Sequence, residues 1–373
     1  METKNFYFKI YGWWKNIDKF IFLIIFSLFF LGLFFSFVST SIIASDKLNT
    51  NSYYFFVKHL IFIAIAIFIL ISISFIEQKK LLKISYLLFI IFVISLILVP
   101  IIGIEVKGSK RWIDLPSPFP NFQPIELLKP FFIISIASVI SIEKNKNIYL
   151  NYFLSFLLLL PIVFLLIMQP DIGQTILIIS TWLTLIFVSG ISLIIFFSSF
   201  IFIGSLISYL IFFIPKFEYI KNRIISFLNP NTGSNYQSEK ASEAIINGGF
   251  FGKGVGEGTL NSKIPEAHTD YIVSVISEEF GIIIVLIIIL FFLTLTYRVF
   301  KKINIQSENK IKLILLGTIS ILLIQALIHI GVNISFLPTT GMTLPFLSYG
   351  GSSIISTAIL AGVILNLTKR NLN

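Results

Sequence analysis

The chain of 373 residues has no cysteine, only three histidines and few charged residues, 12% of the total. Without cysteine it cannot form disulfides, use a thiol nucleophile or bind metals and iron–sulfur clusters through thiolates. His59, His268 and His329 are far apart in the sequence, so a histidine-rich zinc site is not expected and a metal would need oxygen ligands. A soluble domain is about 25% charged, so this chain has too few polar side chains to cover a water-exposed surface. Its 41 phenylalanines and long Ile/Leu runs exclude a disordered chain, which leaves a polytopic membrane protein.

Long apolar runs predict an all-α polytopic membrane protein with about ten transmembrane helices, because a span needs ~20 mostly apolar residues. The runs cover residues 20–43, 55–76, 84–104, 124–142, 149–168, 173–189, 191–214, 271–297, 312–333 and 347–368. The first run is longer than the ~7–15 residues of a signal peptide and is expected to be retained. We expect a single integral membrane domain over residues 1–373, with tails at 1–19 and 369–373 and a large loop at 215–270 between helices 7 and 8.

The distribution of basic residues predicts the orientation. Sixteen of the 28 Lys and Arg residues fall on the side of the termini, against six on the other side when the large loop is set apart. Both termini are therefore expected to be cytoplasmic. The net charge of +10 does not indicate nucleic-acid binding, since the basic residues recur in short patches between the apolar runs. The glycine-rich stretch 252–259 lacks the spacing of a nucleotide-binding loop, so an ATP-driven pump is not expected.

Candidate functional residues gather in the polar segments predicted to lie outside, at 105–123, 169–174, 215–270 and 337–345. In the first of these, Lys110, Arg111 and Trp112 follow Lys107. Such a group could anchor the chain at the membrane interface, or it could bind an anionic headgroup or a diphosphate. This second alternative is favoured because cations on an outer loop run against the topological bias.

Two further candidates carry charge near the membrane boundary. Glu126 and Lys129 are three residues apart, on one face of the predicted fourth span. They could form an intrahelical ion pair, or Lys129 could face an anionic group, because charges at membrane depth are functional candidates. Asp171 precedes the sixth span, where it could cap the helix or contact a ligand.

The large loop contains the densest group of polar side chains. Residues 216–229 have the spacing of an interfacial helix, and a second short helix is predicted from Tyr236 and Gln237. A glycine-rich stretch with Lys253 and Lys263 follows. The loop closes on a cluster of candidates, Glu266, His268, Thr269 and Asp270, with Glu278 and Glu279 expected one to two turns deeper in the eighth span. Asp270 could be a helix cap, or a general base for a sugar hydroxyl.

Five segments occurring in order resemble the SEDS family of polytopic proteins of bacterial cell-wall synthesis. They are KGSKRWI with QPIELLK (107–129), QPDIGQ (169–174), YQSEKASEAIINGGFFGKGVGEG (236–258), PEAHTDYI (265–272) and LPTTGMTLPFLSYGGSS (337–353). The last segment, rich in proline and glycine, is expected to have irregular backbone that lines a cavity. Ala267 and the TGMTLPFLSYGG form of the last segment are more similar to the cell-division branch of the family than to its elongation branch.

The resemblance implies a peptidoglycan glycosyltransferase that polymerises lipid II into β-1,4-linked strands with inversion. It carries the family's aspartate onto Asp270 as general base. Lipid II and undecaprenyl-diphosphate-linked glycan would be bound by residues drawn from these segments, namely Lys110, Arg111, Trp112, Glu126, Lys129, Asp171, Tyr236, Gln237, Lys253, Lys263, Glu266, His268 and Ser348. No organic cofactor is expected, and a divalent cation, Mg²⁺ or Mn²⁺, could assist.

The resemblance also implies a place in the bacterial cytoplasmic (inner) membrane, at the division septum, with a class B penicillin-binding protein and other division proteins as partners. The alternatives are an elongation-type glycosyltransferase, a lipid II flippase, a secondary transporter that uses Glu278 and Glu279, and a scaffold. Charge concentrated at the outer boundary favours chemistry at the membrane surface over translocation.

Overall fold

The structure is a computed structural model that describes residues 10–40, 53–106, 109–116, 121–143, 147–229 and 236–369. Several predicted features lie outside these residues: the first part of the N-terminal tail (1–9), the end of the first span (41–43), Lys107 and residues 370–373 of the C-terminal tail.

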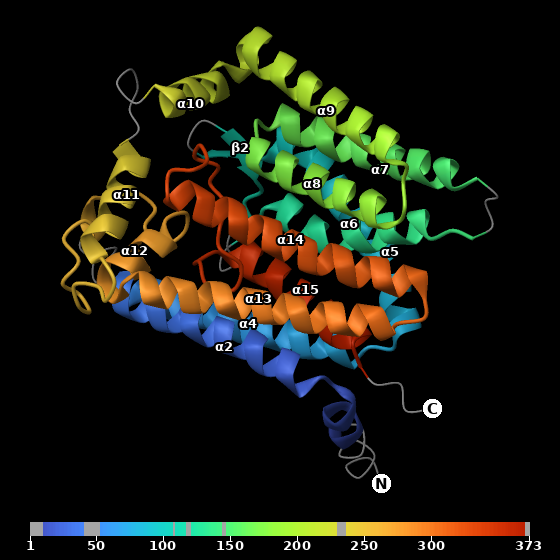
Figure 1. Cartoon of the computed structure of the whole chain (residues 1–373), viewed down its shortest axis with the longest axis horizontal. Helices are drawn as coiled ribbons and strands as arrows, with labels where there is room; N and C mark the ends of the chain where they lie inside the picture. The colour runs from blue at the N-terminus through green and yellow to red at the C-terminus, as the bar shows by residue number, and fades with distance from the viewer. Residues whose placement is uncertain are drawn as a thin grey trace.

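Helices make up most of the described chain (Figure 1). Those that follow the predicted spans are α2 Lys19–Phe35 with the π-helical turn η1 Ser36–Thr40, α4 Tyr54–Phe75, α5 Gln78–Ile102, α6 Pro124–Ile140, α7 Ile148–Met168, α8 Ile172–Val188, α9 Leu193–Phe213, α13 Ile282–Ile305, α14 Asn309–Asn333 and α15 Gly351–Leu367. The large loop contains η2 Pro215–Phe217, α10 Glu218–Leu228, α11 Tyr236–Gly248 and η4 Asn261–Lys263, and α12 Ile272–Phe280 follows it. One element was not predicted, an antiparallel hairpin of β1 Ile104–Val106 and β2 Ser109–Trp112.

Seven helices in the described part of the chain are long and apolar enough to cross a membrane, namely α2, α4, α5, α7, α9, α13 and α14, and α8 and α15 are shorter apolar helices. The helical, multi-pass fold is therefore confirmed. Several helices begin where a side chain accepts backbone N–H groups: Asp18 at α2, Asn147 at α7, Asp171 at α8 and Ser192 at α9. Such caps satisfy amide groups that have no partner inside the helix.

The prediction of one eighth span over 271–297 is wrong. The segment forms two helices, α12 and α13, which are separated at Gly281. The φ of +82° at this residue ends α12, and a side chain here would collide with the carbonyl oxygen of Phe250. Glycine permits both the positive φ and the close approach. Glu278 and Glu279 consequently lie in a short helix before the span, not inside it.

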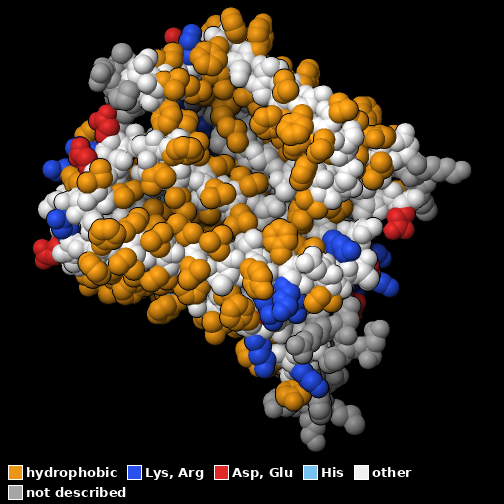
Figure 2. All heavy atoms as spheres, viewed as in Figure 1, with side chains coloured by type: hydrophobic (Ala, Val, Ile, Leu, Met, Phe, Trp, Pro, Cys, Tyr) orange, Lys and Arg blue, Asp and Glu red, His pale blue; other side chains and the backbone are white. Residues whose placement is uncertain are grey.

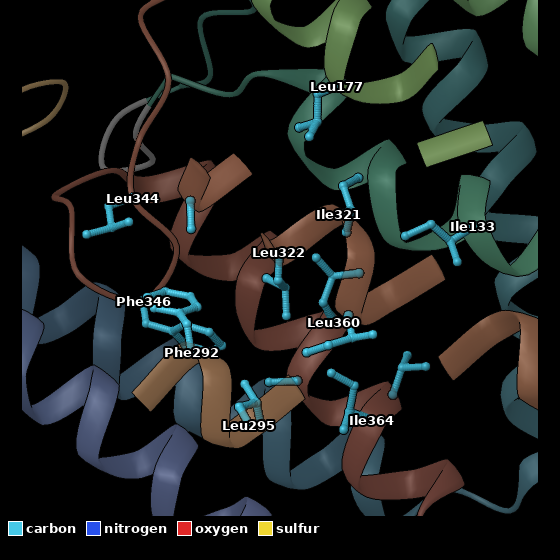
Figure 3. Packing of buried hydrophobic residues seen from close by; sticks show 14 of the residues in the cluster. Ile133, Leu177, Phe292, Leu295, Ile321, Leu322, Leu344, Phe346, Leu360 and Ile364 are labelled. Carbon is cyan, nitrogen blue, oxygen red and sulfur yellow. The ribbon is translucent and has the colours of Figure 1, made fainter. Parts of the chain in front are cut away.

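The core lies around α14 and α15, which are buried along most of their length. Figure 3 shows side chains from α6, α8, α13, α14 and α15 converging there, together with Leu344 and Phe346 of the segment 337–350. This last segment is therefore part of the core, although it has no regular secondary structure between the two helices. By contrast, Ile211 is the one buried residue of α9, which runs along the edge of the bundle (Figure 1).

The two ends of the bundle differ in character. The start of α2, the end of α15 and the α4–α5, α8–α9 and α13–α14 turns lie at one end, and β2, α10, α11 and α12 lie at the other (Figure 1). At the first end, buried Asp18 pairs with Arg298 Nη2 and Lys302 Nζ of α13, both at 3.0 Å. Between the ends, hydrophobic side chains dominate the surface (Figure 2), as expected where lipid surrounds the helices.

Candidate functional site

Asp270 lies in the turn before α12, and its backbone is held by α14. The Asn333 side chain donates from Nδ2 to the carbonyl oxygen of Asp270 at 3.0 Å, and its Oδ1 accepts from the backbone N–H and hydroxyl of Ser274 at 3.1 and 2.9 Å. Asn333 is fully buried, whereas Asp270 is half-buried. The side-chain amide of Asn333 thus fixes the start of α12, and the carboxylate of Asp270 lies at the boundary of the bundle.

The segment 337–350 forms one wall beside this carboxylate. Gly341 has φ +71°, and a Cβ placed there would lie 3.7 Å from Asp270 Oδ2. Arg223 of α10 contacts the same segment two residues before Gly341, where its Nη1 donates to the carbonyl oxygen of Thr339 at 3.2 Å. Burial and the Asp270 carboxylate raise the pKa of Tyr271 above its usual value, and the Arg223 guanidinium opposes this. Both charged groups therefore act on Tyr271, the residue next to Asp270.

The other predicted residues of the Pro265–Ile272 cluster connect it to the same wall. Ser348 donates its hydroxyl to the carbonyl oxygen of Thr269 at 2.7 Å and accepts the N–H of Leu344 at 2.8 Å. The Thr269 hydroxyl donates to Glu266 Oε2 at 3.1 Å. The ring of His268 lies 5.7 Å from that of Tyr349, whose N–H donates to the His268 carbonyl oxygen at 3.0 Å. The structure thus places Glu266, His268, Asp270 and Ser348 in one region.

A second polar cluster, formed by Arg111, Gln123, Asp171, Gln174, Glu126 and Lys129, lies between β2, α6 and α8. Arg111 donates to the carbonyl oxygens of Gln169 and Pro170 and lies 3.7 Å from Asp171 Oδ1. Asp171 also caps α8 through Gln174 N–H and accepts from Gln123 Nε2, both at 3.4 Å. Burial raises the pKa of Asp171, and the Arg111 charge opposes the rise. Asp171 is therefore a helix cap, the first of its two predicted alternatives, and also an ion-pair partner.

The second cluster continues inward to α14. Lys129 Nζ lies 2.7 Å from Glu126 Oε2 and donates to Gln325 Oε1 at 3.0 Å, while Gln325 Nε2 donates to the Thr343 carbonyl oxygen at 2.9 Å. Gln174 Nε2 donates to Glu126 Oε1 at 2.6 Å. Of the two alternatives for Lys129, the structure has the intrahelical ion pair, with a side chain only 1% exposed. The ion pair therefore connects α6, through α14, to the wall that faces Asp270.

The glycine-rich stretch rests on α12. Glu278 Oε1 accepts from Asn247 Nδ2 and Leu260 N–H, and its Oε2 accepts from Asn261 N–H, all at 3.0 Å. Glu279 Oε1 accepts from Asn261 Nδ2 at 2.9 Å. These two carboxylates therefore hold the loop together.

The remaining predicted residues lie on the surface around the two clusters. Lys253 and Lys263 are exposed on the segment after α11. Tyr236 and Gln237 are exposed at the start of α11, where the Ser238 carbonyl oxygen accepts a hydrogen bond from Ser335, two residues after the end of α14. Lys110 is exposed and Trp112 half-buried on β2. Among the described residues, no three His, Asp or Glu side chains group as metal ligands.

Sequence reasoning missed Asn333, Arg223 and Gln325. A signal existed for two of them: Gln325 and Asn333 are amides eight residues apart in an otherwise apolar run, and with His329 they fall on one helical face. Arg223 gave no comparable signal, because it was read as one of several basic residues of an interfacial helix.

The fold and these clusters define a multi-pass helical membrane protein with polar residues gathered at one membrane boundary. Residues 18–373 match the FtsW, RodA and SpoVE family, described as cell cycle protein. The chain belongs to this family, which confirms the resemblance inferred from the five segments.

Relatives and solved structures agree with this assignment. The chain is 35% identical over 284 residues, 74% of its length, to a probable peptidoglycan glycosyltransferase FtsW of Trichlorobacter lovleyi, of which 73% is covered. It is 35% identical over 286 residues to stage V sporulation protein E of Bacillus subtilis, covering 74% of this chain and 76% of the relative.

A structure described as showing polymerization and crosslinking by a peptidoglycan synthase complex has a chain with TM-score 0.79 and 24% identity, covering 94% of this chain and 97% of that one. The Thermus thermophilus rod shape determining protein RodA gives a TM-score of 0.70 at 22% identity, covering 94% and 96%. At these identities the likeness to the solved structures concerns the fold alone.

Proposed function

We propose that the protein is a peptidoglycan glycosyltransferase that polymerises lipid II, and that Asp270 is its general base. The observation that carries this is the placement of Asp270: a half-buried carboxylate at a membrane boundary, with its backbone fixed by Asn333 and its carboxylate beside Gly341. Relatives named peptidoglycan glycosyltransferase at about one-third identity over three-quarters of the chain support it.

The proposed reaction joins two lipid-linked saccharides. Asp270 takes the proton of the acceptor GlcNAc 4-hydroxyl while that oxygen attacks the donor MurNAc anomeric carbon. The bond from this carbon to the diphosphate oxygen breaks with inversion, giving a β-1,4 link and undecaprenyl diphosphate. A positioned base of this kind contributes about 10²–10⁴-fold to the rate.

The leaving diphosphate gains negative charge, which needs cations or hydrogen-bond donors. Arg223 donates to the carbonyl oxygen of Thr339, in the segment whose Gly341 lies beside the Asp270 carboxylate, and we propose it as one such cation. Lys253, Lys263 and Lys110 are exposed cations of the same end of the bundle, and we propose them as further contacts to the diphosphate. Arg111 is held by the turn at 169–171, so we assign it the positioning of that turn against the segment 337–350, where Gly173 packs on Thr340.

The alternative of a secondary transporter requires carboxylates that are free to exchange their partners in the membrane. Glu278 and Glu279 both accept hydrogen bonds from the glycine-rich loop and lie before the span, and this favours a structural role for them. From the resemblance to the SEDS family, we also propose a class B penicillin-binding protein as the partner and the division septum as the location.

The test is lipid II polymerisation by the purified protein with its transpeptidase partner. We expect Asp270→Asn to lower the rate of polymer formation by ~10²-fold or more. Asp114→Asn is the matched control, since Asp114 is an exposed carboxylate of the segment after β2, and it should retain the parental rate. Near-normal polymerisation by Asp270→Asn, with folding and membrane insertion unchanged, would refute the assignment.

A further inference from the structure

Phe250 and Phe251 form an exposed apolar pair between α11 and the glycine-rich stretch. Their exposed fractions are 72% and 84%. The glycines on either side, Gly249 and Gly252, have φ angles of +56° and +81°, so the chain turns sharply on both sides of the pair. The two rings are therefore presented outward by a tight turn and do not pack on the rest of the loop.

The backbone of this turn is fixed to the first turn of α13. Ile282 N–H donates to the Gly249 carbonyl oxygen at 3.0 Å, and Ile283 N–H donates to the Phe250 carbonyl oxygen at 3.5 Å. These bonds satisfy amide groups at the start of the helix that have no partner within it. Because the apolar run of α13 begins at Ile282, the phenylalanine pair lies at the depth where this helix enters the membrane.

The surface of α13 continues from the pair as an exposed apolar face. Ile283, Leu286 and Leu290 are 38%, 56% and 59% exposed, as expected for side chains that face lipid. In Figure 2, hydrophobic side chains also cover the face of the molecule on which α13 lies in Figure 1, and charged side chains collect at the outer edge of the loop region.

We propose that Phe250 and Phe251 insert into the membrane leaflet beside the first turns of α13, so that lipid is the partner of this surface. Continuity with the lipid-facing side of α13 favours lipid over a protein partner. Exposed Lys253 lies two residues on, where its ammonium group can reach the headgroups while its stem stays among apolar groups. Apolar side chains with adjacent cations are typical of segments that lie in the membrane interface.

This contact would restrain the segment that carries Asp270. Gly248 packs directly on the backbone of Ser277, and Lys253 N–H donates to the Glu278 carbonyl oxygen at 2.8 Å, so the turn and α12 are one unit. The insertion itself does not depend on the proposed enzymatic function.

The absence of cysteine from the chain allows a direct test by site-directed spin labelling. Phe251→Cys, Glu257→Cys and Leu290→Cys variants of the full chain would be labelled and placed in vesicles of zwitterionic and anionic phospholipid. Collision rates would be measured with oxygen, which concentrates in the bilayer, and with a water-soluble nickel chelate. Glu257, an exposed carboxylate of the same loop, is the aqueous control, and Leu290 is the lipid control.

The label at Phe251 should be more accessible to oxygen and better shielded from nickel than the label at Glu257. Its ratio of the two rates should lie between those of Glu257 and Leu290, because Leu290 is about two turns deeper along α13. A ratio for Phe251 equal to that of Glu257 would overturn the proposal, since no protein partner is present to compete with lipid. Phe250→Cys provides a second measurement in case one label disturbs the turn, and the same two outcomes apply to it.

Discussion

Replacing Lys129 by methionine should destabilise the protein strongly, because it removes one partner of a buried ion pair. The side chains of Lys129 and Glu126 are 1% and 5% exposed, with Nζ and Oε2 at 2.7 Å. Without the ammonium group, the Glu126 carboxylate keeps Gln174 as its donor, and Gln325 Oε1 loses the donor that it has now. Breaking a buried pair in this way costs about 3–5 kcal/mol.

The double variant Lys129→Met with Glu126→Gln separates this effect from simple loss of packing. A glutamine at 126 is neutral and can still accept the Gln174 hydrogen bond, so the uncompensated charge is gone. What remains is the lost hydrogen bond to Gln325, which contributes about 1 kcal/mol. We therefore expect the double variant to recover about 2–4 kcal/mol of the loss caused by Lys129→Met alone.

The assay is equilibrium unfolding in mixed micelles, followed by circular dichroism and by the fluorescence of buried Trp182. Lys80→Met is the matched control, because Lys80 pairs with Glu77 at 3.2 Å in the same i, i+3 arrangement but with side chains 68% and 72% exposed. Its effect should stay within about 0.5 kcal/mol. The reasoning would be refuted if Lys129→Met unfolded like Lys80→Met, or if the double variant were no more stable than the single one.

Three further predictions concern the two ends of the bundle. Asn333→Ala should lower polymerisation ~10–100-fold while binding of lipid II persists, because Asp270 loses its backbone anchor; equal losses of binding and rate would contradict this. Gly281→Ala should cost ~1–3 kcal/mol in unfolding free energy, whereas Gly204→Ala in α9, where a Cβ meets nothing within 4 Å, should be neutral or slightly stabilising. Burial alone would raise the pKa of Asp18, but hydrogen bonds from the two cations of α13 outweigh it and hold that pKa below 3.8. This stabilisation is present above the ordinary pKa and is lost as the pH falls through the lowered one, so Asp18→Asn should weaken the dependence of thermal stability on pH below about 4.

Much of the candidate site could be predicted from the sequence because its residues are contiguous. Glu266, His268 and Asp270 lie within five residues, and the short turn that joins them brings them together in any fold. Asn333 and Arg223 could not be placed in this way, because they lie on helices distant in the sequence: Asn333 contacts Asp270, and Arg223 contacts the neighbouring segment at Thr339. Which residue supports the aspartate depends on how α10 and α14 pack against the segment 337–350.

The choice between alternatives also required the structure. For Lys129 and Asp171 the sequence allowed either a partner within the protein or a ligand, since the spacing of side chains is the same in both cases. Packing around α14 buries Lys129 against Glu126 and Gln325, and an ammonium group at this depth must be paired. The break between α12 and α13 at Gly281 also depends on tertiary packing. The positive φ of Gly281 goes with the close approach of the Phe250 backbone, which the run of isoleucines after Gly281 does not indicate.

By itself, the sequence determined that the protein is helical and crosses the membrane many times, since apolar run length and scarce charge leave the backbone no other way to satisfy its hydrogen bonds in lipid. It also predicted that the candidate functional residues gather at one boundary, around Asp270. Only the tertiary structure decided which polar groups face one another across the helices, which carboxylates hold a loop together, and where the eighth span begins. Those outcomes depend on contacts between residues far apart in the chain, and periodicity and composition do not report such contacts.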